Sequence, residues 1–164
     1  MLDRQASPQF SAPAVRGVEP SGLDRVLAGA GGDAASLLAR CLLGGIFVQS
    51  GFGKLMALEG FAASLARNGV PMPELWAIIG AVVEFAGGLA VIIGWQTRAA
   101  AALMLAFTVV ATLISHRFWE FAEVAARRQQ AVQFAKNIAI MGGFLLLFVQ
   151  GGRRFGVDGW RGRG

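Results

Sequence analysis

The sequence is poor in charged residues. Only 15% of its 164 residues are charged, whereas an average soluble domain carries about a quarter. A soluble domain of this size leaves roughly 30% of its unfolded surface facing water, and so few charges do not cover such a surface. Hydrophobic residues make up 55% of the chain and the mean hydropathy is +0.56, which excludes a disordered chain as well as a soluble globule.

Cysteine and histidine occur once each, as Cys41 and His116. A disulfide framework needs paired cysteines. Zinc and haem sites need more nitrogen or sulfur ligands than one His and one Cys supply. The sequence therefore excludes a disulfide scaffold, a bis-His haem and a dithiol redox pair within the chain, and we predict no metal site.

The sequence contains several long uncharged stretches. Four apolar blocks, with their flanking ends, each reach the roughly 20 residues that a helix needs to cross a bilayer core of about 30 Å. Trp76 and Trp95 mark the ends of the second block, as expected of rings that prefer the membrane interface. The sequence predicts an all-α, four-helix transmembrane bundle over residues 36–152, with spans at about 36–56, 74–95, 98–117 and 132–151.

The segments outside the spans are predicted to be tails and short interfacial helices. Residues 1–35 mix Pro, Ser, Gly and charges, so we expect a disordered tail with a short helix at about 23–30 and no signal peptide. Residues 60–68 are expected to form an interfacial helix that ends at Gly69 and the following prolines. Residues 118–130 are expected to lie at the outer face or to extend the fourth span, and residues 153–164 to form a basic tail.

The net charge is +5, and its distribution matters more than its size. The arginines are dispersed around the spans without an aromatic platform for bases, so anionic lipid is the expected partner and nucleic acid is not. Nine of the 15 Lys and Arg residues fall on the side of the two termini and six on the other side. Because cytoplasmic loops carry the excess of Lys and Arg, we expect both termini to be cytoplasmic.

Small residues recur along the spans, three of which carry a glycine pair. In lipid, helices associate largely by close backbone approach at small residues. Gly44 and Gly51 share one helical stripe with Arg40 and Lys54, which indicates a packing face. We interpret the following glycines as helix-packing positions without a catalytic role: Gly44, Gly51, Gly80, Gly87, Gly88, Gly142 and Gly143.

Glu84 is the one charged residue inside the second block and lies near the bilayer midplane. An ionised carboxylate there costs several kcal/mol, so it must be protonated, paired or facing a cavity. Its candidate partners lie in the outer third of the other spans: Lys54, His116, Lys136 and Asn137. We interpret this set as a buried acid–base cluster open to the outer face and able to bind a small polar or quinone-like ligand. A structural polar clamp, or simple snorkelling to the interface, is the alternative.

Several motifs resemble the DoxX family of membrane proteins. They are Arg40-x3-Gly44-x2-Phe47-x3-Gly51-x2-Lys54-Leu55, Gly80-x3-Glu84-x2-Gly87-Gly88, Gly94-x2-Thr97-Arg98 and Phe134-x-Lys136-Asn137-x4-Gly142-Gly143. The resemblance covers about residues 36–158. It implies a four-helix protein of the bacterial inner membrane, in a family that includes a subunit of a thiosulfate:quinone oxidoreductase and associates of redox or oxidative-stress proteins. The shared polar positions of the family correspond to Arg40, Lys54, Glu84, Arg98, Lys136 and Asn137, and we assign Arg40 and Arg98 a structural role.

Three functional hypotheses follow. The first is a non-catalytic subunit or accessory of a quinone- or thiol-linked redox system, with no redox centre of its own, a non-covalent quinone as its ligand, and redox proteins or a second copy as partners. The second is a carrier of a small solute or protons, although four spans without inverted repeats are few for a transporter. The third is a membrane scaffold or assembly factor without a ligand.

Overall fold

The computed structural model describes residues 21–162, which form helices joined by short connections. The helices are α1 (Gly22–Ala28), α2 (Ala30–Met56), α3 (Leu58–Arg67), α4 (Pro73–Ile93), α5 (Thr97–Ser115), the short 3-10 helix η1 (Phe118–Glu120), α6 (Val124–Gln150) and α7 (Val157–Arg161). No strand occurs among the described residues.

Within residues 21–162, four helices are long and apolar enough to cross a membrane: α2, α4, α5 and α6. Many of their large apolar side chains are exposed, as the outer surface of a bundle in lipid requires; Leu42 and Leu146, for example, are 69% and 64% exposed. The predicted all-α, four-helix transmembrane architecture is therefore confirmed.

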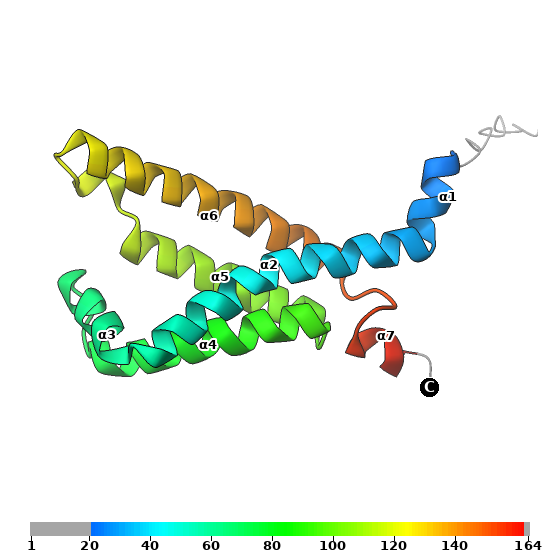
Figure 1. Ribbon diagram of the computed structural model, residues 1–164, viewed down its shortest axis with the longest axis horizontal. Helices are drawn as coiled ribbons and strands as arrows, with labels where there is room; N and C mark the ends of the chain where they lie inside the picture. Colours follow the sequence, from blue (N-terminus) through cyan, green and yellow to red (C-terminus); the bar gives the residue numbers. More distant parts are fainter. Residues whose placement is uncertain (1–20, 163–164) are drawn as a thin grey trace, which may run out of the picture.

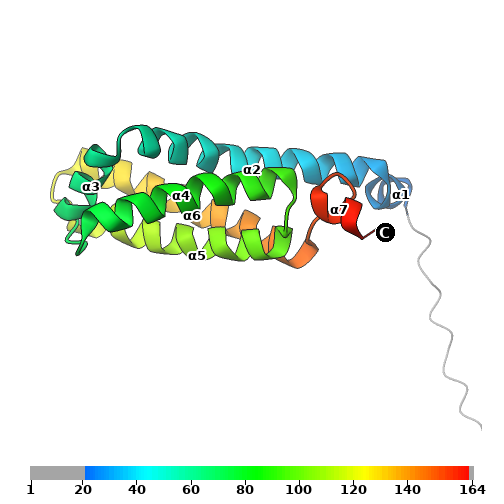
Figure 2. The ribbon, with the colours of Figure 1, turned by 90° about the horizontal axis from the view of Figure 1, so that it is seen from below.

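The four long helices run side by side along the long axis of the molecule (Figure 2). α2 packs mainly against α4, and α5 packs mainly against α6, while α4 also contacts α5 and α3. α6 diverges from α2 toward the end of the bundle where α3 lies (Figure 1). α1 and α7 lie at the opposite end, which we call the terminal end.

Local signals in the sequence explain most helix boundaries. Pro73 occupies the first turn of α4, where its missing N–H costs nothing. Gly94, with φ of 70°, ends α4 in the left-handed conformation that glycine adopts without strain. Glu123 starts α6, because its carboxylate accepts hydrogen bonds from the backbone N–H groups of Ala125 and Ala126 at 2.8 and 2.6 Å.

The helices extend beyond the predicted spans at two places. α2 begins at Ala30 rather than near residue 36, and the capping box of Ser21 with Asp24 starts α1 just before it, so residues 22–35 of the expected tail are mostly helical. α6 begins at Val124 rather than near residue 132, so the charged segment after η1 extends the fourth span. Residues 1–20, the rest of the expected tail, lie outside the described part of the chain, as do residues 163–164.

Glycines set the close contact between α2 and α4. A Cβ atom added at Gly44 would lie 2.6 Å from the carbonyl oxygen of Gly88, and one added at Gly51 would lie 2.6 Å from the backbone nitrogen of Phe85. Both distances are too short for a side chain, so these helices can meet at this separation only because the residues are glycines.

The other predicted packing glycines differ in how closely neighbouring atoms approach them. Gly87 fits against the Met104 side chain, and a Cβ at Gly143 would lie 2.9 Å from Leu43, so both are at tight contacts. Gly80 has room, because its nearest neighbour, Phe61, would be 3.6 Å from an added Cβ. Gly142 departs from the prediction: a Cβ there would meet nothing within 4 Å, because this side of α6 faces away from the other helices.

The terminal end is closed by the segment that follows α6. The guanidinium of Arg40 is fully buried and donates a hydrogen bond to the carbonyl oxygen of Phe155. Asp158 on α7 accepts hydrogen bonds from the backbone nitrogens of Gln96 and Thr97 at 2.8 and 2.7 Å. Toward the middle of the bundle, apolar side chains of all four long helices fill the core: Phe47, Val91, Met104 and Phe144 are all buried.

Candidate functional site

A cavity of about 320 Å³ lies at the end of the bundle remote from α1 and α7. We call it the polar cavity. Its lining side chains come from α2 to α6 and include five that were singled out in the sequence: Lys54, Glu84, His116, Lys136 and Asn137. The structure thus brings the whole predicted polar cluster to one place, and its role in binding a ligand stays a prediction.

An ion pair between Lys54 and Glu84 joins α2 to α4 at this cavity. Glu84 is 4% exposed, and the Lys54 side chain is 30% exposed; both line the cavity. The close approach of α2 to α4 at Gly51, one turn before Lys54, brings the two side chains within reach. Several partners for Glu84 were open from the sequence, and the structure selects Lys54.

The Lys54 ammonium also lies 4.9 Å from the centre of the Phe61 ring. A cation over an aromatic face is attracted by the ring quadrupole. Phe61 belongs to α3 and lines the cavity, so this contact positions α3 against the ion pair.

Lys136 is the second lysine of the polar cavity and is not part of the Lys54–Glu84 ion pair. Among the residues that the structure describes, no carboxylate lies within 4 Å of its ammonium. Since Lys54 and Glu84 compensate each other, the cavity carries one net positive charge at neutral pH when His116 is neutral. An anionic group, or one with hydrogen-bond-accepting oxygens, is the complement of such a site.

Hydrogen bonds fix Asn137 and the row of threonines facing it. The Asn137 amide nitrogen donates to Thr112 Oγ1 at 2.9 Å. The Thr112 hydroxyl donates to the Thr108 carbonyl oxygen, and the Thr108 hydroxyl to that of Met104, each at 2.6 Å. Sequence reasoning missed these threonines, although their spacing of four on an apolar span puts them on one helix face and was a usable signal.

His116 lies at the rim of the cavity, at the end of α5. Its Nδ1 atom is 2.8 Å from Gln130 Oε1 on α6. A carbonyl oxygen accepts, so Nδ1 carries the proton in this contact. This hydrogen bond ties α5 to α6 where the two helices flank the cavity.

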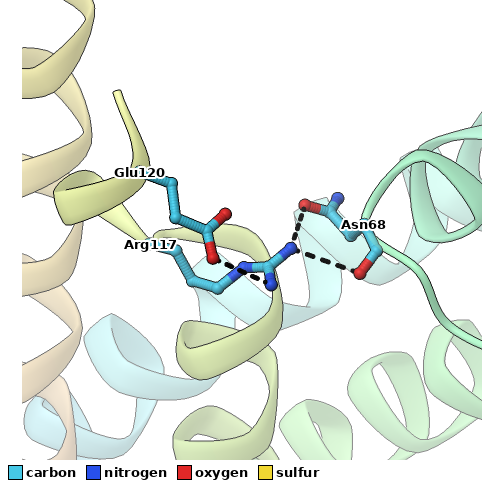
Figure 3. A network of polar contacts seen from close by, with 3 residues as sticks. All are labelled: Asn68, Arg117 and Glu120. Carbon is cyan, nitrogen blue, oxygen red and sulfur yellow. Dashed lines mark hydrogen bonds and ion pairs between the residues drawn. The ribbon is translucent and has the colours of Figure 1, made fainter. Parts of the chain in front are cut away.

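A polar network holds α3 across the end of the bundle (Figure 3). Arg117 donates to the backbone oxygen of Asn68 at 3.2 Å and to its Oδ1 atom at 3.4 Å, and pairs with Glu120 at 3.1 Å. Asn68 in turn donates from its side chain to the carbonyl oxygen of Ser64 at 2.8 Å. The network therefore anchors the helix that contributes Phe61 and Ser64 to the cavity.

No pattern in the sequence predicts this role of Arg117. An arginine directly after an apolar span has the pattern of a residue that extends to the membrane interface, and nothing in the linear order pairs it with Asn68. Ser50, Ser64 and Phe107 also line the cavity and were missed for the same reason, because only the fold brings them together.

A second cavity, of about 460 Å³, adjoins the polar one. We call it the apolar groove. It lies between α3, α4 and α5, and its lining includes Trp76, Ile79, Gly80, Val83 and Val110. Five residues line both cavities: Lys54, Phe61, Phe107, Ala111 and Ser115.

Arg40 and Arg98 are not part of the polar cavity. Both lie at the terminal end, where Arg40 is buried against the C-terminal segment, and Arg98 is exposed and packs beside Gly151. Asp158 has its pKa lowered there: partial burial opposes ionisation, but hydrogen bonds from Thr97 and Gln96 and the charge of Arg161 outweigh it. Within residues 21–162, no group of three His, Cys, Asp or Glu side chains could hold a metal ion.

Comparison with known proteins gives a family and two relatives. The DoxX family model matches residues 35–117, which contain Lys54, Glu84 and His116. Inner membrane protein YphA of Escherichia coli (strain K12) is 34% identical over 122 residues, covering 74% of this chain and 86% of the relative. Inner membrane protein YqjF of the same organism is 34% identical over 126 residues, covering 77% of this chain and 91% of the relative. No solved structure gives a significant match.

Proposed function

The chain belongs to the DoxX family and is a multi-pass inner membrane protein, and we propose that it is a non-catalytic accessory of a quinone- or thiol-linked redox system. In this proposal, the polar cavity binds the head group of a small ligand with hydrogen-bond-accepting oxygens, such as a quinone. The protein supplies the binding site, and a partner supplies the redox centre.

The convergence of five polar residues on one cavity supports this proposal. The volume of about 320 Å³ lies within the range of ligand pockets, about 300–1,000 Å³. Polar groups inside a membrane are costly and usually serve a function, and a structural clamp would need only the Lys54–Glu84 pair. Lys136 is not part of that pair, so its ammonium group can donate a hydrogen bond to an oxygen atom of a ligand.

The donor set fits a quinone head. A quinone ring presents two carbonyl oxygens, which accept hydrogen bonds and donate none. Lys136 on α6 and Lys54 on α2 supply N–H donors from two helices that line the cavity, and the aromatic rings of Phe61 and Phe107 line it as well. Bound there, a quinone would supply the electron-accepting chemistry, while these residues orient its ring and exclude water.

A carrier function is less well supported by the packing. Between the cavity and the terminal end, the bundle is filled by the apolar core, including Phe47, Met104 and Phe144. Beyond the core, the fully buried Arg40 and the segment that carries Phe155 close the terminal end. A cavity that is open at one end and packed at the other is suited to holding a ligand rather than to conducting it.

Ligand titration of the purified protein in nanodiscs tests the proposal. The probe is a benzoquinone head without a side chain, followed by quenching of tryptophan fluorescence. We expect saturable binding, weakened at least about tenfold by Lys136→Met, the scale of one lost charged hydrogen bond. The matched control is Arg128→Met, which removes an exposed cation two turns earlier on α6 and leaves binding unchanged.

Two results would contradict the proposal. One is the absence of saturable binding to the wild-type protein. The other is a Lys136→Met variant that binds as the wild type does while a chromosomal deletion leaves respiration and thiol oxidation unaltered. A scaffold role would then be favoured, in which the polar residues serve packing alone.

A further inference from the structure

The polar cavity and the apolar groove share a wall. Lys54, Phe61 and Phe107 line both of them. The part of the polar cavity that contains the Lys54–Glu84 ion pair therefore borders the apolar groove. One space presents two ammonium groups and an amide, and the other is lined almost entirely by aliphatic and aromatic side chains. Together they have the polarity pattern of a head group joined to a hydrocarbon chain.

The apolar groove lies on the lipid-facing surface of the bundle. Val110 and Leu103 on its α5 side are 56% and 50% exposed, and Trp76 on its α4 side is 46% exposed. In a bundle surrounded by lipid, side chains exposed between α4 and α5 face acyl chains. A molecule dissolved in the membrane can therefore enter the groove from the side, without passing through water.

Gly80 keeps the groove open next to the shared wall. An added Cβ atom there would lie 3.6 Å from the Phe61 ring and 3.9 Å from the Phe107 ring, which is ordinary van der Waals distance. The glycine is therefore not needed for helix contact, unlike Gly44 or Gly51 on α2. What its missing side chain provides is free volume in front of the two rings.

From this arrangement, we propose that the ligand of the polar cavity is a single-chain amphiphile that enters laterally from the bilayer. Its oxygen-bearing head lies at Lys54 and Lys136, and its apolar chain lies in the groove between α3, α4 and α5. The inference rests on the proposed function, since it requires that the polar cavity binds a head group. It adds the class of ligand, the site of the chain and the route of entry.

A series of probes with one head group and different chains tests this inference. The benzoquinone head without a chain is compared with the same head carrying a decyl chain, in nanodiscs, with affinities expressed as mole fractions in the lipid so that partitioning cancels. We expect the decyl probe to bind about fivefold tighter, the scale of packing terms between groups inside membranes.

Filling the groove should remove that preference. Gly80→Leu places its side chain against Phe61 and Phe107, so the ratio of the decyl affinity to the chain-free affinity should fall to about one. Gly80→Ala, for which there is room, should keep most of the preference. Gly142→Leu is the matched control, because this glycine on α6 has open space around it and should leave both affinities unchanged.

The outcomes separate the two proposals. Binding of the chain-free probe without any chain preference, or an undiminished preference in Gly80→Leu, overturns the inference and leaves the proposed function standing. No binding of either probe overturns both. Co-purification of a phospholipid that the decyl probe does not displace also overturns the inference, because the groove would then be an ordinary lipid contact.

Discussion

At the scale of single residues, the Lys54–Glu84 pair shows how one buried carboxylate constrains its surroundings. Glu84 is almost completely buried, whereas its partner remains partly open to the cavity. Removal of one member of a buried pair leaves an uncompensated charge, which is much more destabilising than removal of both. The pair is therefore best examined through its single and double variants.

We expect Lys54→Met to lower the free energy of unfolding by roughly 2–4 kcal/mol, somewhat less than the 3–5 kcal/mol of fully buried pairs because Lys54 is 30% exposed. The double variant Lys54→Met with Glu84→Gln should recover most of this loss. Thermal unfolding in detergent measures both, with Glu74→Gln, an exposed carboxylate of the same helix, as the control. Equal stability of the single and double variants would show that the pair does not carry this energy.

The limits of sequence-based prediction are also set at this scale. The position of Glu84 inside an uncharged span was enough to mark it, and the ends of the neighbouring spans supplied its candidate partners. Which candidate pairs with it depends on the separation of α2 and α4, and that separation depends on contacts such as Gly51 against Phe85 that only the fold reveals. Lys136 meets the same sequence criteria for a partner as Lys54, yet it lines the cavity from α6 and makes no ion pair with Glu84.

At the scale of elements, α7 acts as the cap of α5. Gln96 precedes α5 in a left-handed conformation, and its own side chain makes no capping hydrogen bond. Asp158 takes that place, since its carboxylate accepts from two backbone nitrogens and from the Thr97 hydroxyl at 2.7 Å. A negative charge at this position also interacts favourably with the helix dipole.

The capping contact should weaken in acid. The pKa of Asp158 is lowered in the folded protein, so its contribution to stability is complete above the unfolded-state pKa of about 4 and is lost as the pH falls through the lowered value. We expect Asp158→Asn to lower the unfolding temperature at pH 7. At a pH below the lowered pKa of Asp158, where the wild-type carboxyl is also uncharged, the substitution should change the unfolding temperature little. An equal effect at both pH values would assign the loss to packing rather than to charge.

Elements were predictable to the extent that their signals are local. The four spans, the interfacial helix near residue 60 and the start of α4 at Pro73 follow from hydropathy, glycine and proline. The first turns of α2 were missed, because Ala and Gly there carry no apolar periodicity, although they are compatible with a helix. For the segment before residue 132, extension of the fourth span was one of two expectations, and α6 confirms it from Val124 onward. The prediction that Gly142 packs against a neighbouring helix was wrong, because a pair of adjacent glycines on a span does not show which of the two faces a neighbour.

At the scale of the whole molecule, the helices α1 and α7 lie at one end of the bundle and α3 at the other (Figure 1), and the polar cavity, which Phe61 and Ser64 of α3 line, belongs to the α3 end. The distribution of Lys and Arg predicts cytoplasmic termini, and with that orientation the cavity faces the periplasmic side. Under the proposed function, a redox partner would accordingly be sought on that side or within the membrane.

Cysteine labelling tests this orientation. In a Cys41→Ala background, Gln129→Cys places a thiol at the cavity end and Gly162→Cys places one at the terminal end. We expect a membrane-impermeant maleimide to label the first variant in cells whose outer membrane alone is permeabilised, and the second only after the inner membrane is opened. The reverse pattern would place the cavity on the cytoplasmic side.

The contact between Asp158 and Thr97 spans 61 positions of the chain, and it has a consequence for biosynthesis. The first residue of α5 is synthesised 61 positions before the carboxylate that caps it. The start of α5 therefore stays without this cap until Asp158 has been made and α7 packs against it. Translation that stops early would yield a chain that is inserted yet unfinished, and a membrane protease could recognise it at that open end.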